Sequence, residues 1–178
     1  AVERLCMEVL SKRSKDLQVA AWLAEAWLHR HGLRGLFDGL SLVEQLGTRY
    51  WDAVHPQIED GEVDYRTAPY SWINDNLSLT TRLTVPLAVD QSADGRKLTL
   101  ADWEEALRVE NLARKDAEVA VAAEKAKKIT RNAFLTSVSL TPAAAFSQLL
   151  GELADCTEVI AAIESLLDEK LGENSPGL

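Results

Sequence analysis

Apolar residues recur every three or four positions along most of the chain, and this helical period limits the folds open to it. In the segment 33–54, one face collects Leu33, Leu36, Phe37, Leu40, Val43, Gly47, Tyr50, Trp51 and Val54. His55-Pro56 then ends the segment, because proline lacks an amide hydrogen and restricts the residue before it. No alternation of apolar and polar residues, which a half-buried strand would show, continues beyond a few positions. The sequence therefore predicts an all-α fold.

Further helices are predicted on both sides of this segment. Before it, one helix follows Val2, and a second runs from Asp16 to His31, with Ser14 or Asp16 as its cap and Gly32 as its stop. After it, an acidic loop at 56–68 precedes a short helix that starts at Pro69. We expect residues 1–88 to form a compact helical bundle.

The second half of the chain predicts a long antiparallel helical hairpin. Residues 89–98 carry turn-forming residues and no periodic apolar set, which indicates a linker. Thr99 can cap a helix that runs to about Val138, and Thr141-Pro142 can start the next one. We expect the hairpin at 99–171, packed with the bundle or with a second copy, and a frayed tail at 172–178.

The last predicted helix carries an apolar stripe at a strict spacing of three or four residues. Besides Cys156, it contains Phe146, Leu149, Leu153, Ile160, Ile163 and Leu167. Such a stripe is typical of helices that pair with another helix. These six residues are the predicted interface of a homodimer.

The charge of the chain disfavours nucleic acid as a partner. There are 28 acidic and 19 basic residues, a formal net charge of -9, and residues 135–178 hold seven acids against Lys170 alone. An acidic surface repels phosphates. The one basic cluster, at Lys125, Lys127, Lys128 and Arg131, has no aromatic residues interleaved with it.

The short hydrophobic runs and the two cysteines are typical of a cytosolic protein. We interpret the chain as a fragment of such a protein. The longest apolar run, Val19–Ala24, is six residues, whereas a membrane span needs about 20. Charged residues interrupt the first turns, so no signal peptide is visible. Cys6 and Cys156 suit core thiols in a reducing compartment, although a disulfide between them is conceivable.

The sequence predicts no catalytic residue, metal ligand or cofactor. Glu25 and His29 stand one helical turn apart but lack a third ligand. Asp52 and His55 could form an acid–base pair, yet a histidine at a helix end before proline is more simply a cap. The acidic loop lacks the residue order of a calcium loop.

Tryptophan supplies five of the eleven aromatic residues. On helices with apolar stripes, these side chains are expected in the core. One or two could instead anchor a partner, because exposed tryptophans are frequent interface hot spots.

Residues 3–86 contain an ordered series of short motifs. They are Ser14-Lys15-Asp16-Leu17, Val19–Ala26 with Trp22, His31-Gly32-Leu33, Gly35-Leu36, Gly39-Leu40, Tyr50-Trp51-Asp52, His55-Pro56, Ala68-Pro69 and Trp72-Ile73-Asn74. This series resembles the ImpA-type N-terminal domain of TssA proteins from bacterial type VI secretion systems. The residues themselves are caps, helix stops and large core side chains, so the motif is expected to specify a fold and not an active site.

The resemblance implies a non-enzymatic scaffold in the bacterial cytoplasm. Proteins of that family associate with the baseplate and contractile sheath, and they prime or coordinate polymerisation of the tube and sheath. The implied partners are baseplate, sheath, tube or membrane-complex proteins, with self-association and without membrane insertion. Ring-forming C-terminal regions belong to the family, so this chain is expected to be the N-terminal part of a longer protein of unspecified subclass.

Two other hypotheses compete with the scaffold. One is a generic helical adaptor or dimerisation domain outside secretion. The other is a fragment of a metal-dependent enzyme built around Glu25, His29, Asp52 or His55, which would lack a complete ligand or catalytic set.

Overall fold

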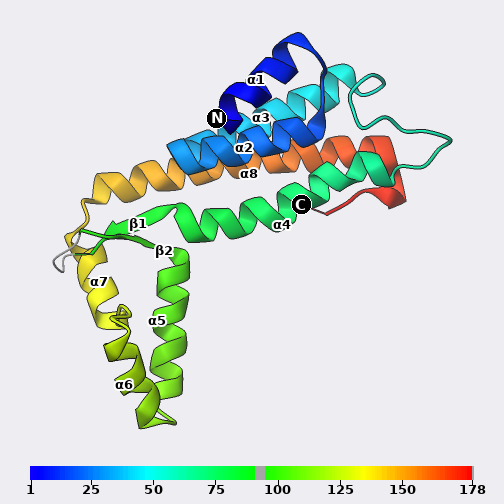
Figure 1. Cartoon of the computed structure of the whole chain (residues 1–178). Coiled ribbons are helices and arrows are strands. Elements are labelled where there is room, and N and C mark those ends of the chain that lie inside the picture. Colours follow the sequence, from blue (N-terminus) through cyan, green and yellow to red (C-terminus); the bar gives the residue numbers. More distant parts are fainter. Residues whose placement is uncertain (91–94, 178) are drawn as a thin grey trace. The chain divides into compact units, whose positions relative to one another are not determined.

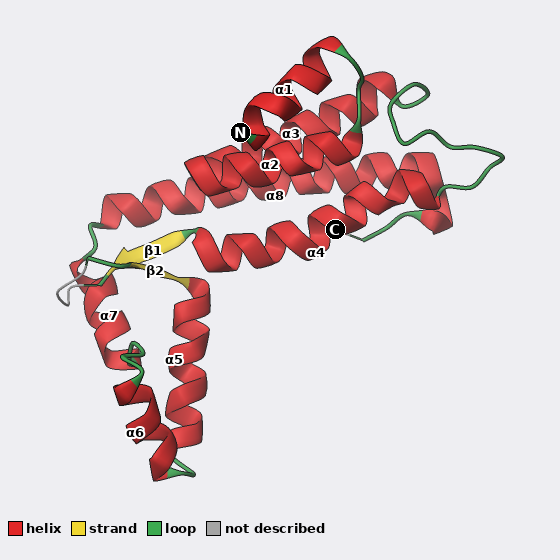
Figure 2. Cartoon of the chain, in the orientation of Figure 1, coloured by secondary structure: helices red, strands yellow, loops and turns green. Residues whose placement is uncertain are grey.

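The computed structural model describes residues 1–90 and 95–177, and helices dominate it (Figure 1). The helices are α1 (Val2–Lys12), α2 (Leu17–His31), α3 (Leu33–Tyr50), α4 (Asp64–Thr84), α5 (Leu100–Ala113), α6 (Ala117–Lys125), α7 (Arg131–Leu140) and α8 (Ala143–Leu171). Two short strands, β1 (Pro86–Val89) and β2 (Lys97–Thr99), pair between α4 and α5 (Figure 2). The predicted all-α class is therefore confirmed for most of the chain, and the strand pair is an addition to it.

The chain divides into two compact units. The first unit combines Ala1–Thr81 with the chain from Leu149 onward, and the second unit is Arg82–Gln148. The predicted segments 1–88, 89–98 and 99–171 follow sequence order, whereas the first unit joins both ends of the chain. Within the predicted tail 172–178, Gly172–Asn174 forms one 3₁₀ turn.

Local signals fix the start and end of α2. The carboxylate of Asp16 accepts a hydrogen bond from the Val19 amide at 3.0 Å, so Asp16 is the N-terminal cap. Gly32 ends the helix with a φ of 63°, a value that glycine adopts without strain. Because α3 begins at the next residue, the two helices turn back on each other and lie side by side (Figure 1).

Two glycines of α3 allow this close approach. A Cβ atom on Gly39 would overlap the Cα and Cβ atoms of Ala24, and one on Gly35 would overlap the carbonyl group of Trp27. The Trp27 carbonyl and the Ala24 Cα belong to the backbone of α2, and the Ala24 Cβ is bonded directly to it. These atoms therefore cannot rotate away. The motifs Gly35-Leu36 and Gly39-Leu40 therefore bring the two helix backbones together.

We expect Gly39→Ala to lower the free energy of unfolding by about 3 kcal/mol, because the added methyl group overpacks the contact with α2. The matched control is Gly151→Ala in α8, where an added Cβ meets no atom within 4 Å. Removing a glycine from an exposed helix interior should stabilise by about 1 kcal/mol. Urea denaturation measures both, and equal effects would contradict the close-packing explanation.

Helix α1 is attached to α2 by Glu3. The indole nitrogen of Trp27 donates a hydrogen bond to Glu3 Oε1 at 3.0 Å, and the other carboxylate oxygen of Glu3 pairs with Arg30. These contacts lower the pKa of Glu3, first through the hydrogen bond from Trp27 and then through the positive charge of Arg30. On the same helix, Cys6 and Leu10 are buried.

The stabilisation from Glu3 should be present above the ordinary glutamate pKa and lost as pH falls through the lowered pKa of the folded state. We expect the indole Nε1 proton resonance of Trp27 to shift as pH falls below the ordinary glutamate pKa of 4.5. Glu3→Gln should abolish that shift, since the amide does not titrate. A shift of the same size in the variant would assign the transition to another carboxylate.

The second unit has its own small core beside the strand pair. The strands are antiparallel, with Ala88 opposite Leu98. The buried cluster is Ala88, Leu98 and Phe134, packed against Leu87, Trp103, Ile129 and Val138. The predicted linker 89–98 thus contributes to the strands at both of its ends, and residues 91–94 lie outside the described part. Strands of four and three residues are too short for alternation to reveal them.

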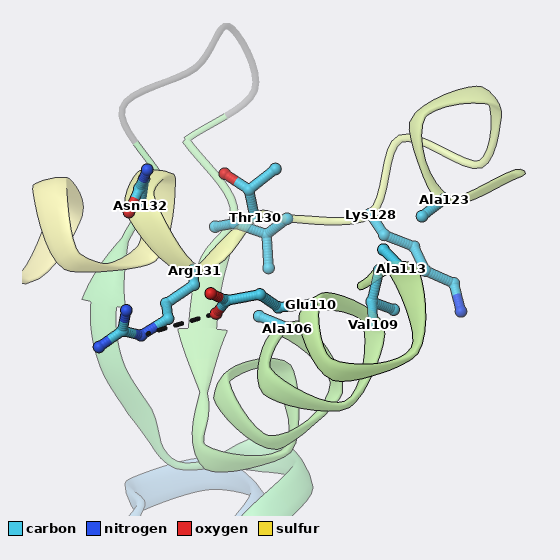
Figure 3. A pocket seen from close by; sticks show the side chains of 10 residues that line it. Ala106, Val109, Glu110, Ala113, Ala123, Lys128, Thr130, Arg131 and Asn132 are labelled. Atoms are coloured by element: carbon cyan, nitrogen blue, oxygen red, sulfur yellow. Dashed lines mark ion pairs between the residues drawn. The ribbon is translucent and has the colours of Figure 1, made fainter. Parts of the chain in front are cut away.

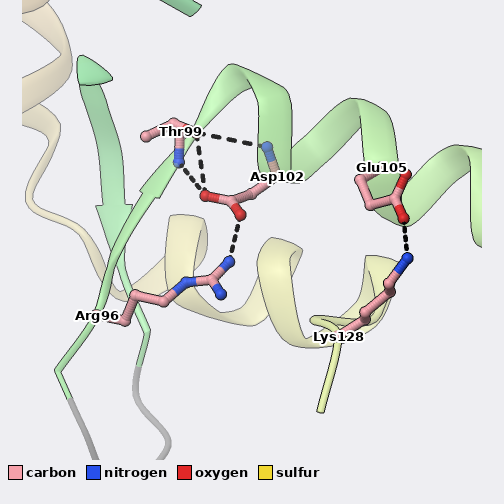
Figure 4. Close-up of polar contacts among 5 residues, drawn as sticks. All are labelled: Arg96, Thr99, Asp102, Glu105 and Lys128. Carbon is pink, nitrogen blue, oxygen red and sulfur yellow. Dashed lines mark hydrogen bonds and ion pairs between the residues drawn. The ribbon is translucent and has the colours of Figure 1, made fainter. Parts of the chain in front are cut away.

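Polar contacts order the start of α5 (Figure 4). Thr99 is the predicted cap, and it forms a reciprocal capping box with Asp102. Asp102 also pairs with Arg96 from the strand connection, and Glu105 one turn later pairs with Lys128. The prediction of a Thr99 cap is confirmed.

The prediction of one long helix from about Leu100 toward Val138 is wrong, because this stretch forms three helices, α5, α6 and α7. Asp116 accepts a hydrogen bond from the Glu118 amide at 2.9 Å where α6 begins. Lys127 has a φ of 51°, and Thr130 caps α7 by accepting from the Ala133 amide at 3.2 Å. Side chains that bond the local backbone compete with helix continuation, and the apolar period does not register them.

Helix α4 starts earlier than predicted. It begins at Asp64, so Pro69 lies inside the helix and the loop is shorter than 56–68. The preference of proline for the first helical position gave the wrong start. The predicted end before Val85-Pro86 is correct.

Candidate functional site

Two motifs that are far apart in sequence meet in the first unit. The Leu17 amide donates to the His55 carbonyl at 2.8 Å, and the His55 amide donates to the Lys15 carbonyl at 2.8 Å. Lys15 Nζ donates to the Leu10 carbonyl at 2.5 Å and lies 6.0 Å from the centre of the Tyr50 ring. The segment before α2 is therefore tied to the turn after α3.

A buried arginine holds the same turn from the other side. Arg66 is only 1% exposed, and its guanidinium donates to three backbone carbonyls: Pro56 at 2.5 Å, Trp51 at 2.7 Å and Val54 at 2.9 Å. Its Cζ atom also lies 4.8 Å from the centre of the Trp51 ring. We call Arg66 with these three carbonyl residues the Arg66 clamp.

The charge of the Arg66 clamp is balanced by its surroundings. Burial lowers the pKa of Arg66, and the neighbouring Tyr70 and Asp52 oppose that effect. Burial raises the pKa of Tyr70 to about 12, and the charge of Arg66 opposes this rise. Tyr70 is therefore neutral at physiological pH, and the guanidinium is stabilised by carbonyl dipoles instead of a bonded carboxylate.

The sequence analysis missed Arg66. A signal was present, because Arg66, Tyr70, Ile73 and Leu77 follow one another at helical spacing and are all buried. A charged residue in line with a buried stripe needs buried partners. Those partners are backbone carbonyls from another segment, which a side-chain pattern does not show.

We expect Arg66→Lys to lower the free energy of unfolding by about 3 kcal/mol, because a lysine cannot serve three divergent carbonyls and leaves buried acceptors unpaired. The matched control is Arg49→Lys, at an exposed position near the end of α3. Chemical denaturation gives both values. A loss below about 0.5 kcal/mol would show that the clamp contributes little to stability.

The structure separates the motif residues predicted from the sequence into covered and exposed groups. Partly buried are Ser14, Lys15, Asp16, Trp51, Pro56 and Trp72; exposed are Trp22, Tyr50, Asp52, His55 and Asn74. Trp22 is 45% exposed and is therefore not a core residue, whereas the sequence left open that one or two tryptophans lie outside the core.

The candidate dimer residues on α8 divide in the same way. Ile163 and Leu167 are fully buried within the first unit, so they are not available to a second copy. Phe146, Leu149 and Ile160 are partly buried, and Leu153 is exposed. An apolar stripe does not distinguish packing within a chain from packing between chains.

The described residues contain no group of three or more histidine, cysteine, aspartate or glutamate side chains placed to hold a metal ion. His29, Asp52 and His55 are exposed, and Glu25 is partly buried. These four residues, proposed for the metal-enzyme alternative, therefore do not assemble a ligand set in the described part of the chain.

Both cysteines are free and buried, which contradicts the alternative of a disulfide between them. Burial raises the pKa of Cys6, and it raises that of Cys156 to about 11 with help from Asp155 and Glu152. The thiol of Cys156 donates to the Leu33 carbonyl at 3.5 Å. Protonated, enclosed thiols are poor nucleophiles, so these residues serve packing.

The second unit has a recess of about 530 Å³ between α5 and the segment before α7 (Figure 3). Its lining is Ala106, Val109, Glu110, Ala113, Ala123, Lys128, Ile129, Thr130, Arg131 and Asn132. Glu110 pairs with Arg114 at 2.7 Å and lies 3.8 Å from Arg131. The lining thus combines apolar residues with charged side chains that are paired, and it includes no nucleophile–base pair.

No single helix in the described residues has the length and hydropathy needed to cross a membrane. The segments Arg131–Leu140 and Ala143–Asn174 reach that length and hydropathy only when they are taken together, and a 98° bend separates them.

Comparisons with known proteins agree with the motif series. The family described as ImpA, N-terminal, type VI secretion system matches residues 1–75. A solved structure, the N-terminal domain including the conserved ImpA_N region of the TssA component from Burkholderia cenocepacia, superposes with a TM-score of 0.90 at 30% identity. That match covers 99% of this chain and 69% of the other. The chain belongs to the TssA family of type VI secretion components.

A curated TssA relative is similar over a shorter region. Type VI secretion system component TssA1 of Pseudomonas aeruginosa is 49% identical over 47 residues, which are 26% of this chain and 14% of that protein. The resemblance to TssA is thereby confirmed. The Burkholderia TssA domain extends the likeness from the motif region to nearly the whole chain.

Proposed function

We propose that this TssA-type chain is a non-enzymatic assembly module that acts in the bacterial cytoplasm. It associates with baseplate, sheath and tube components and helps to prime or coordinate polymerisation of the tube and sheath. The observation that carries the proposal is the likeness to a TssA N-terminal domain over 99% of the chain.

The use of polar groups inside the first unit supports a structural role. The side chains of Asp16, Lys15 and Arg66 bond the backbone of their own chain. Asp16 caps α2, Lys15 bonds Leu10 of α1, and Arg66 ties α4 to the turn after α3. Groups committed to internal hydrogen bonds are not positioned to act on a substrate. The motif residues thus shape a scaffold whose exposed side chains are left for partners.

The proposal includes self-association through α8, with fewer interface residues than the sequence predicts. Leu153 is exposed, and Leu149 and Ile160 are partly buried, so these three can contribute to an interface. Ile163 and Leu167 instead hold α8 in the first unit. A generic helical adaptor would have the same exposed residues, but the TssA motif series and the matched fold favour secretion.

An affinity capture experiment tests the assembly role. We expect the immobilised chain to retain at least one purified baseplate, sheath, tube or membrane-complex subunit from its own secretion cluster. Light scattering then gives the mass of each complex and of the chain alone. Failure to capture any subunit would contradict direct assembly by this region, and a monomeric chain would remove self-association through α8.

A further inference from the structure

Helix α4 carries a second apolar face besides its buried one. Tyr65, Trp72 and Leu79 are spaced by seven residues, which is close to two helical turns, so they lie on one stripe. Tyr65 is 70% exposed and Leu79 is 52% exposed, while Trp72 is partly buried. All three belong to the first unit. An exposed heptad stripe of large side chains is typical of a helix that receives another helix.

The surroundings of this stripe are acidic. Five exposed acids precede or flank it: Glu59, Asp60, Glu62, Asp64 and Asp75. Between residues 57 and 81 the one basic residue is Arg66. Because Arg66 is buried and bonded to three carbonyls, it does not neutralise the surface.

The stripe is held in place by the buried face of the same helix. Arg66 follows Tyr65 directly and anchors the start of α4 to the turn after α3. Further along the helix, Tyr70, Ile73 and Leu77 are buried. A preformed surface loses little conformational freedom on binding, which favours affinity.

We propose that this face of α4 docks a basic amphipathic helix of a partner protein, with apolar residues at seven-residue spacing flanked by lysine or arginine. The apolar residues pack on Tyr65, Trp72 and Leu79, and the bases face the five acids. A second copy of this surface would bring five more acids, and the nearest exposed base of α4, Arg82, is already paired with Glu104 at 2.5 Å. The inference deepens the proposed function, on which it rests, by naming the chemistry of a partner.

The test uses the full 178-residue chain and a designed peptide of leucine heptads flanked by lysines. Calorimetry compares this peptide with a scrambled peptide of the same composition and with one whose lysines are glutamates. We expect the amphipathic basic peptide to bind about tenfold more tightly than either, with affinity falling as salt rises. Nuclear magnetic resonance should place the largest shifts on α4. Equal affinities, or shifts centred elsewhere, would overturn the proposal.

Matched double variants distinguish binding at this surface from non-specific hydrophobic binding. Tyr65→Ser with Leu79→Ser should weaken binding about tenfold or more. The control, Leu5→Ser with Leu150→Ser, removes two other exposed apolar side chains of the first unit and should leave affinity unchanged. Equal losses would overturn the proposal. So would a parent dimer that only the α4 variant makes monomeric, since the occupant would then be a second copy.

Different results would contradict the assembly role and the docking of a basic helix at α4. Peptide binding at α4 without capture of any secretion subunit would retain the docking surface and reject the assembly role. Capture of a subunit that the α4 variant and its control retain equally would support assembly and overturn docking at this face.

Discussion

The first unit depends on how one polar turn is satisfied in an apolar environment. Between α3 and α4 the chain leaves helical structure, and the carbonyls of Trp51, Val54 and Pro56 accept hydrogen bonds from Arg66 of α4. Leaving such groups unpaired would cost more free energy than most apolar contacts supply. A single guanidinium has enough donors, in a rigid planar array, to serve all three. The start of α4 is therefore tied to this turn by the hydrogen bonds of one side chain, and Tyr70, Ile73 and Leu77 bury the rest of that face.

The hydrogen bonds around this turn link the N-terminal helices into one framework. Hydrogen bonds from His55 to Lys15 and from Leu17 to His55 connect the segment before α2 to the turn after α3. Arg66 then connects Pro56, the next residue of that turn, to α4. Glycines of α3 let α2 and α3 approach until a side chain would meet backbone, while α1 packs on α2 through Glu3 and Trp27. Rigid interiors of this kind suit a scaffold, because binding at the surface then requires little rearrangement.

Local chemistry explains what the sequence could predict, and distant contacts explain the rest. Asp16, Gly32 and Thr99 act on residues within a few positions, so their roles were visible in advance. Arg66 acts on carbonyls more distant in sequence, and Ile163 is buried by tertiary packing, so neither role follows from spacing alone. The breaks at Asp116 and Thr130 show the opposite case, where a local hydrogen bond overrides a continuing apolar period.

The division of the chain also orders its assembly in time. The first unit takes its last helical segment from beyond Leu149, after the whole of the second unit. Cys156, Ile163 and Leu167 are buried in this unit, and they are synthesised after all of its N-terminal helices. The second unit, whose internal contacts are contiguous in sequence, can meanwhile form on its own. The first unit is therefore complete only once the second unit has been synthesised in full and α8 has followed it.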